Sequence, residues 1–172
     1  MHTVLVTCAD KAGKPDIITL SWAMPASGSP PMVAIGVSPR RLSHTLIEET
    51  KEFIVNIPTM DIVNETLYCG RISGRRVDKF KETGLTPIPA KKVKPPAIKE
   101  CVAHLECRLR SQIETGDHTI FIGEVIEAYA NKDTFKTGYD LRKARMLFHV
   151  GGDDFTTLKV RVTRPKIKQM LR

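Results

Sequence analysis

Residues 19–56 read TLSWAMPASGSPPMVAIGVSPRRLSHTLIEETKEFIVN and contain the most informative pattern in this chain. One apolar strand pattern ends at Trp22, the only tryptophan of the sequence, and a second covers residues 32–37. Between the two stand Pro25, Gly28, Pro30 and Pro31. Proline lacks the backbone donor that a strand ladder needs, and glycine favours turns, so we expect an irregular connection here.

A cluster of cations and hydroxyl groups follows the second strand pattern. Thr45 and Glu48 have the spacing of a capping box, which predicts a helix that begins between Ser43 and Thr45. The first N–H groups of a helix have no partner within the helix, and its dipole is positive at that end. Arg40 and Arg41 lie just before this start. Two arginines beside free N–H groups favour a phosphate ligand.

Short strand patterns recur along the chain, at residues 3–7, 17–22, 32–37, 52–57, 102–111 and 119–130. Residues 10–14 have turn composition and predict a hairpin between the first two strands. The predicted helices are few and short, at residues 46–50, 62–70 and 77–83. These patterns indicate a mainly β protein with antiparallel strands, arranged as a barrel or a sandwich.

Residues 102–109 alternate between apolar and polar side chains. Leu105 and Cys107 would lie on one face of this strand, and His104 and Glu106 on the other. We therefore expect His104 and Glu106 to face solvent. The same alternation separates His104 from Cys101 and Cys107, and no recognisable zinc spacing is present, so no metal site is predicted.

Length and composition favour one globular domain over residues 1–172. The chain has 41% hydrophobic and 27% charged residues, which excludes wholesale disorder, and no apolar run is long enough for a membrane span. The four cysteines are scattered in a manner typical of reduced thiols. Because the sequence begins without a cationic leader pattern, we expect a cytoplasmic protein.

The net charge of +8 is concentrated at the C-terminal end, since six basic and no acidic residues follow Asp154. A basic end can bind nucleic acid, but interleaved aromatic residues and a recognition motif are missing from the sequence. A solvated or dimer-packed tail is therefore the favoured interpretation of residues 158–172. A basic nucleic-acid-binding barrel is the alternative.

Six blocks occur in a characteristic order, at residues 17–24, 30–35, 38–44, 53–58, 69–74 with 78–80, and 116–125. In this order they resemble the flavin reductase-like, FMN-binding split-barrel family, and within it the flavoredoxin and ferric reductase branch. The resemblance implies a Greek-key split β-barrel of about six antiparallel strands with a few short helices. It also implies a homodimer with each FMN near the subunit boundary. Since the chain begins later than many members of this family, we expect a missing N-terminal segment.

The resemblance further implies roles for single residues. Trp22 would pack against the flavin, Lys79 would approach the isoalloxazine ring, and His118 would form the opposite wall. The ribityl chain and the phosphate would be held by Thr19, Ser21, Ser38, Arg40, Arg41 and Ser43. Phe148 would supply an aromatic cover from the C-terminal side. Asp16 stands where relatives often have an asparagine near the ring, and a carboxylate accepts hydrogen bonds but cannot donate them.

The function implied is that of an FMN-dependent oxidoreductase, with Lys79 and His118 as the catalytic residues. Electrons would pass from NAD(P)H through FMN to ferric iron, free flavin or a redox protein. No GxGxxG motif follows a strand, so NAD(P)H would lie directly over the flavin. A non-enzymatic FMN electron carrier, a flavoredoxin, is the alternative within redox chemistry.

Each of these residues also has a purely structural interpretation. Trp22 could belong to the core, and adjacent arginines are usually solvated. Lys79 could simply pair with Glu82, and a lone histidine beside a turn, such as His118, is usually a surface residue. Cys69 has no base beside it in the sequence, so packing or a place near the flavin is favoured over a nucleophilic role.

Overall fold

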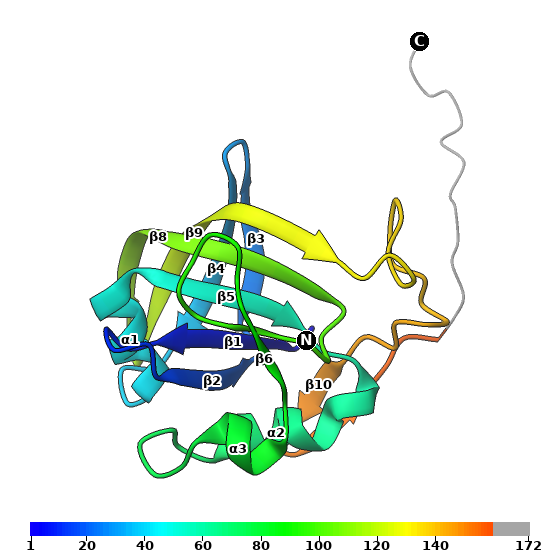
Figure 1. Cartoon of the computed structure of the whole chain (residues 1–172), viewed down its shortest axis with the longest axis horizontal. Helices are drawn as coiled ribbons and strands as arrows, with labels where there is room; N and C mark the ends of the chain where they lie inside the picture. Colours follow the sequence, from blue (N-terminus) through cyan, green and yellow to red (C-terminus); the bar gives the residue numbers. More distant parts are fainter. Residues whose placement is uncertain (160–172) are drawn as a thin grey trace.

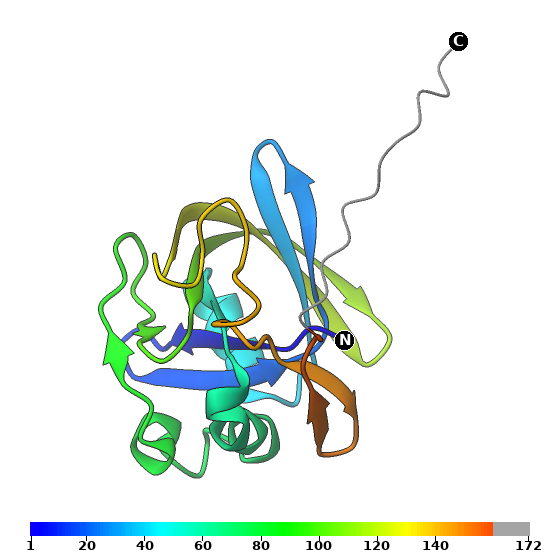
Figure 2. The same cartoon turned by 90° about the vertical axis from the view of Figure 1, so that its right-hand side faces the viewer.

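The computed structural model describes residues 1–159, and its centre is a seven-stranded antiparallel sheet (Figures 1 and 2). The strands follow the order β2–β1–β5–β8–β9–β4–β3. Their bounds are β1 Val4–Ala9, β2 Pro15–Leu20, β3 Ala23–Gly28, β4 Pro31–Val37, β5 Glu52–Ile57, β8 Ala103–Thr115 and β9 His118–Ala130. The six strands predicted from the sequence are all present, and β3 is additional.

The sheet curves around one large core. Val6 of β1, Ile35 of β4 and Phe121 of β9 belong to the same buried cluster, although β1 and β4 are not neighbours in the sheet. A sheet that wraps its strands around one set of apolar side chains forms a barrel, because each strand alternates between an inward and an outward face. The predicted mainly β barrel is therefore confirmed.

Helices cover the outer side of β1 and β2. Helices α2 (Val63–Arg71) and α3 (Lys79–Thr83) pack against β2, and the short 3-10 helix η1 (Met60–Ile62) leads into α2. Leu5 and Ile17 contribute to a second buried cluster beneath these helices. All six residues of β1 are consequently buried, since the strand has the barrel core on one face and the helices on the other.

Three smaller parts complete the described chain. Helix α1 (Leu42–Thr50) packs against β1 and β2. Strands β6 (Pro87–Ile88) and β7 (Ala97–Ile98) form a two-residue ladder, and β10 (Phe148–Gly151) and β11 (Asp154–Thr156) form a separate hairpin. In Figure 2 the β10–β11 hairpin projects on the side where the N-terminus lies.

The predicted irregular connection after Trp22 is wrong. Its residues form β3, which within residues 1–159 is an edge strand that pairs only with β4. The register shifts between Pro25 and Ser27, so the ladder is interrupted beside the proline. An edge strand leaves one row of backbone groups unpaired, and proline is tolerated there because its missing donor is not needed.

The predicted exposure of His104 and Glu106 is also wrong, since both side chains are buried. The Glu106 carboxylate accepts hydrogen bonds from the backbone N–H groups of Lys91 (2.8 Å) and Lys92 (2.7 Å). His104 Nδ1 lies 2.8 Å from Asn56 Oδ1. The segment between β6 and β7 therefore folds over this face of β8 and supplies part of its polar partners.

The described residues include no helix that is both long and apolar enough to cross a membrane. All four cysteines are free and buried. The predicted dimer-packed tail falls largely on residues 160–172, which lie outside the described residues.

Candidate functional site

A groove of about 560 Å³ opens where β2, α2, β10 and the start of α1 approach one another. Seven residues that the sequence predicted for a ligand site line it: Thr19, Ser21, Trp22, Ser38, Arg40, Arg41 and His118. They come from three segments that only the folded barrel brings together. The volume is within the range of about 300–1,000 Å³ that is typical of small-molecule and cofactor sites.

Trp22 forms an aromatic wall of the groove. Its ring lies 4.4 Å from the ring of His118, and 53% of its surface is exposed, which excludes a plain core role. Gly36 of β4 makes room for the indole, because a Cβ at this position would be 3.2 Å from Trp22 Cε3. The backbone N–H of Gly36 also donates to the Trp22 carbonyl at 2.8 Å. The indole is thus held in place with its surface available for stacking.

The N-terminus of α1 forms the cationic end of the groove. Arg41 is the N-cap residue, and no side chain of residues 1–159 caps this helix. A helix N-terminus carries a positive dipole end and N–H groups without an intrahelical partner. The predicted capping box is therefore wrong: the helix begins at Leu42, and Thr45 lies within it. Arg40 and Arg41 are exposed, and neither makes an ion pair with any residue in the range 1–159. Two guanidinium groups and a helix N-terminus together favour an anionic ligand.

His118 begins β9 on the side of the groove next to Trp22. Its Nδ1 lies 2.7 Å from Asp117 Oδ1. This hydrogen bond, together with the charges of His118 and Arg40, lowers the pKa of the exposed Asp117 carboxyl group. His118 is thus oriented by a carboxylate that itself stays outside the groove lining.

Helix α2 approaches the end of β2 closely at one side of the groove. Gly70 permits this close approach, because a Cβ there would lie 3.1 Å from Thr19 Cβ. The Thr19 hydroxyl donates to the Thr66 carbonyl of the same helix. Thr19 therefore joins β2 to α2 in addition to lining the groove.

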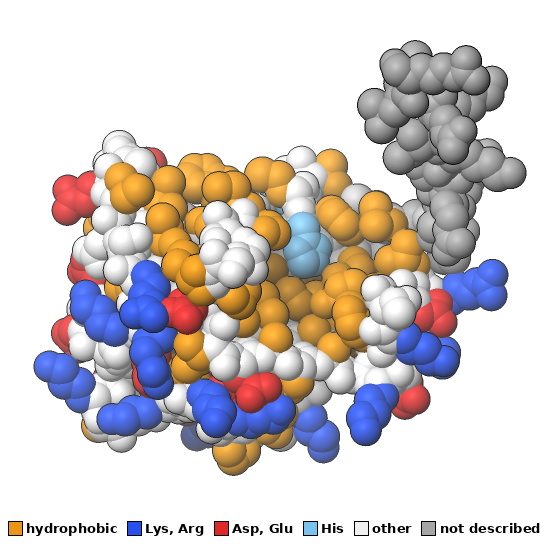
Figure 3. Space-filling model, turned by 90° about the horizontal axis from the view of Figure 1, so that it is seen from above, with side chains coloured by type: hydrophobic (Ala, Val, Ile, Leu, Met, Phe, Trp, Pro, Cys, Tyr) orange, Lys and Arg blue, Asp and Glu red, His pale blue; other side chains and the backbone are white. Residues whose placement is uncertain are grey.

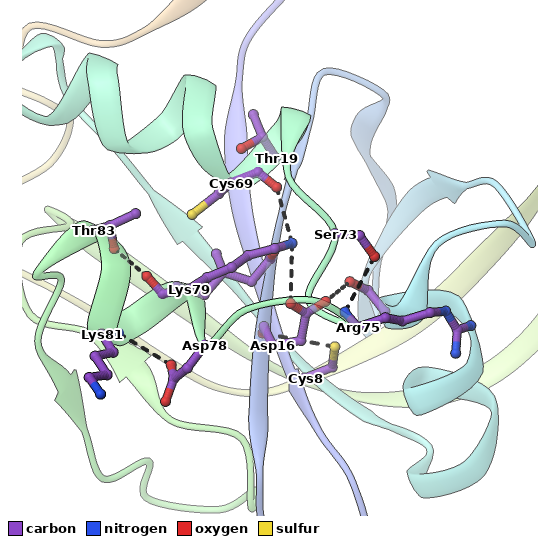
Figure 4. Close-up of polar contacts among 12 residues, drawn as sticks. Cys8, Asp16, Thr19, Cys69, Ser73, Arg75, Asp78, Lys79, Lys81 and Thr83 are labelled. Carbon is purple, nitrogen blue, oxygen red and sulfur yellow. Dashed lines mark hydrogen bonds and ion pairs between the residues drawn. The ribbon is translucent and has the colours of Figure 1, made fainter.

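Asp16, Ser43 and Lys79 do not line the groove. All three are buried and have polar partners inside the protein. Figure 4 shows Lys79 pointing toward Asp16. Ser43 Oγ donates to Asp16 Oδ2 at 2.6 Å, and Lys79 Nζ lies 3.1 Å from Asp16 Oδ1. The geometry therefore does not favour a direct contact between any of these three side chains and a ligand in the groove.

Phe148 is likewise turned away from the groove. Its ring lies 5.5 Å from that of His2 and packs against the barrel core. The backbone of β10 brings the next residue, His149, to the groove instead, because adjacent strand residues point to opposite faces.

Sequence reasoning gave no site role to seven further lining residues: Met1, Ile18, Leu20, Gly36, Gly70, Ser73 and His149. Met1 is tied to His149 by two hydrogen bonds of 2.9 Å between their backbone groups, the first from the chain's amino group. Arg71 holds the β10–β11 hairpin, donating through Nε to Asp153 at 2.7 Å. The sequence contained a signal for two of these residues, because Gly70 and Ser73 belong to the block 69–74 on which the family resemblance rests.

Two further cavities adjoin the groove. One of about 160 Å³ lies between α2 and the β10–β11 hairpin and shares Thr19 and Ser21 with it. The other, of about 440 Å³, is mostly apolar, and its lining includes Trp22, Met24 and Ile120. Figure 3 shows hydrophobic side chains gathered around a hollow on the side where β9 and the β3–β4 hairpin lie.

The groove suits a flat aromatic ligand with an anionic end. Among the described residues, its lining includes neither a cysteine nor a carboxylate. Cys69 precedes the lining residue Gly70 and is buried. This burial raises the pKa of its thiol to about 12, so the reactive thiolate is not formed near neutral pH. The protein therefore supplies binding and orientation, and a bound cofactor would have to supply the reaction chemistry.

Known proteins resemble this chain in sequence and in structure. A protein-family model described as "Flavin reductase like domain" matches residues 1–152. An uncharacterized protein of Archaeoglobus fulgidus is 39% identical over 145 residues, which are 84% of this chain and 81% of that protein. The flavoredoxin of Methanosarcina acetivorans has a similar solved structure, with a TM-score of 0.86 and 31% identity over 95% of this chain and 88% of its own. The NADH:FAD oxidoreductase of Streptomyces globisporus C-1027 gives a TM-score of 0.76 with 25% identity, over 92% and 86%.

Proposed function

The chain belongs to the flavin reductase-like domain family, and from this membership we propose that its groove binds FMN and that the protein is an FMN-dependent oxidoreductase. The proposal rests on one observation: Trp22 and the cationic N-terminus of α1 line the same groove. An aromatic wall fits the isoalloxazine ring, and arginines with free N–H groups fit a phosphate. The side chains present are thus suited to FMN.

We assign the binding roles by position. Arg40, Arg41 and the first N–H groups of α1 would hold the phosphate, and Ser38 is within the same lining. Thr19 and Ser21 at the end of β2 would face the ribityl chain, between the phosphate site and Trp22. Trp22 would orient the ring and shield one face from water. FMN, when bound, supplies the transfer of a hydride or of single electrons.

We propose NAD(P)H as the electron donor and ferric iron, free flavin or a redox protein as the acceptor. A donor role for a nicotinamide is supported by the similarity to a protein named an NADH:FAD oxidoreductase. The cavity of about 160 Å³ that adjoins the groove gives a co-substrate space beside Thr19. A cytoplasmic location is also proposed, since four free buried thiols suit a reducing compartment.

A homodimer is proposed on the basis of an apolar outer face of the barrel. Met24, Ala34 and Ile122 stand in one row across β3, β4 and β9, and Ile120 and Ile113 are paired in the adjoining part of β9 and β8. Met24 is 61% exposed and Ile113 52% exposed in the single chain. A patch of neighbouring apolar side chains on a sheet favours burial against a second copy.

A second candidate function is an electron carrier without NAD(P)H oxidase activity. The similarity to a flavoredoxin of known structure supports it. A carrier would bind FMN in the same groove and exchange electrons with protein partners, but it would not oxidise a nicotinamide.

The visible absorption spectrum of the purified protein tests the proposal. We expect a flavin band, release of FMN on denaturation, and bleaching of the band by NADH or NADPH without air. Bleaching by dithionite alone would identify the carrier instead. A purified protein that shows no flavin band and takes up none of the added FMN would refute flavin binding altogether.

A further inference from the structure

Asp16 and Lys79 form a buried ion pair directly behind the groove (Figure 4). Their side chains are 3% and 4% exposed, and Lys79 Nζ lies 3.1 Å from Asp16 Oδ1. Taking two charges out of water costs several kcal/mol per ion and is tolerated only when each charge is compensated. The pair is therefore a fixed arrangement of opposite charges, and neither residue reaches a ligand in the groove.

The pair joins the elements that build the groove. The Ser43 hydroxyl, in the first turn of α1, donates to Asp16 Oδ2 at 2.6 Å. Lys79 Nζ donates to the Cys69 carbonyl of α2 at 3.2 Å and to the Ile17 carbonyl of β2. These two side chains thus connect the N-terminus of α1, strand β2 and helix α2 to one another.

Only one layer of residues separates the pair from the groove. Asp16 and Lys79 line a very small cavity together with Ile18, Arg41 and Ser73, and these three residues also line the groove. Gly74 closes the cavity, because a Cβ at this position would lie 2.1 Å from Asp16 Oδ1. The two charges consequently act on the groove through protein, which screens them less than water does.

We infer that Asp16 and Lys79 are positioning residues whose opposite charges compensate each other, so that neither charge alone shifts the equilibrium between oxidised and reduced flavin in the groove. This inference rests on the proposed FMN binding. When bound FMN takes up two electrons and one proton, its ring gains one negative charge. Lys79 favours that charge and Asp16 opposes it, so the intact pair adds little net bias. Removal of either partner exposes the effect of the other.

Four variants test the inference through the midpoint potential of bound FMN. Asp16→Asn leaves the lysine unbalanced, and we expect reduced FMN to be favoured about tenfold, which raises the potential by about 30 mV for a two-electron couple. Lys79→Met leaves the carboxylate unbalanced and should lower the potential by a similar amount. The double variant should return to within about twofold of the wild-type equilibrium. Lys79→Arg should keep the potential.

Asp78→Asn is the matched control, since it removes a carboxylate next to Lys79 in the chain but at an exposed N-cap. Asparagine still caps a helix, so we expect less than about a twofold change in the redox equilibrium. If Lys79→Met does not fold, Asp16→Asn and the double variant still carry the test. A potential that does not rise in Asp16→Asn, or that moves the same way in both single variants, overturns the inference.

The unfolding temperature of the flavin-free protein gives a readout that does not depend on FMN. Each single variant should unfold at a lower temperature than the double variant, because one buried charge without its partner is worse than none. Additive losses would overturn the buried pair itself. A wild-type protein that binds no FMN would contradict the proposed function, and the unfolding temperatures would still report on the pair.

Discussion

Arg40 and Arg41 lie at the start of α1, which has no side-chain cap among the residues that the structure describes. We expect Arg40→Ala or Arg41→Ala to weaken FMN binding by about tenfold or more, because a charge-assisted hydrogen bond contributes about 1.5–3 kcal/mol. Riboflavin lacks the phosphate, so its affinity should change little. Fluorescence titration of the flavin-free protein with both ligands measures the two losses.

Arg142→Ala is the control for this comparison, since Arg142 is an exposed arginine outside the groove lining. It should leave both affinities unchanged. Equal losses of FMN and riboflavin affinity in both groove variants would place the phosphate elsewhere.

The substitution Gly36→Ala tests whether FMN affinity depends on the position of Trp22. A Cβ at residue 36 would lie 3.2 Å from Trp22 Cε3, so Gly36→Ala must displace the indole by a few tenths of an ångström. We expect FMN affinity to fall severalfold while the free energy of unfolding changes by less than about 1.5 kcal/mol. Flavin titration and urea unfolding measure the two effects.

Gly28→Ala is the matched substitution in the neighbouring strand, where a Cβ would meet no atom within 4 Å. It should leave FMN affinity unchanged. The same loss of affinity in both glycine variants would show that Trp22 is not the residue affected.

At the level of single residues, the sequence indicated which side chains are polar or aromatic but not which way they point. Trp22 and the two arginines could be assigned to a groove because strand ends and helix starts lie at the surface. Ser43 and Lys79 were assigned to the ligand, yet both turn toward Asp16. The direction of each side chain depends on Asp16, which lies 27 or more residues away along the chain. Local sequence patterns do not specify so distant a partner.

Strand β8 with its cover from the β6–β7 segment predicts an acid sensitivity. Burial lowers the pKa of His104 to about 4, although the Glu106 carboxylate opposes the shift. Above the ordinary pKa of 6.5 both the folded and the unfolded chain hold this histidine neutral. As the pH falls from about 6.5 to about 4, the unfolded chain binds a proton that the folded chain does not, so stability is lost by up to about 3 kcal/mol.

Urea unfolding at about pH 7 and about pH 4.5 measures this loss. His104→Gln removes the titrating group, so the difference in unfolding free energy between the two pH values should shrink in this variant. An identical pH dependence in wild type and variant would contradict the assignment and would attribute the acid sensitivity to other groups.

At the level of elements, the hydrophobic pattern located the six long strands correctly, because their periodicity is a local property. It failed where a distant segment changes the surroundings. Glu106 alternates as a surface residue would, but the chain between β6 and β7 covers it. The prolines of β3 indicated a loop, and only the position of this strand at the sheet edge makes them acceptable.

For the whole molecule, the barrel class followed from many short antiparallel strands with few helices. The complete lining of the groove could not be predicted from these patterns. Met1 and His149 meet there although almost the whole chain lies between them, and α2 reaches Thr19 only because residue 70 is glycine. Wrapping of the sheet around one core fixes such distant contacts together, so they become visible only in the folded structure.

The apolar outer face of the barrel predicts the state of assembly. Met24 is largely exposed in the single chain and lies in one row with Ala34 and Ile122. If a second copy covers this face, Met24→Asp places a charge in the interface and should raise the dimer dissociation constant by about thirtyfold or more, as expected for a loss of about 2 kcal/mol. Phe135→Asp, at a partly exposed apolar residue outside these rows, should not. Light scattering over a range of concentrations measures both, and a wild-type monomer with full FMN occupancy would show that the groove is complete without a partner.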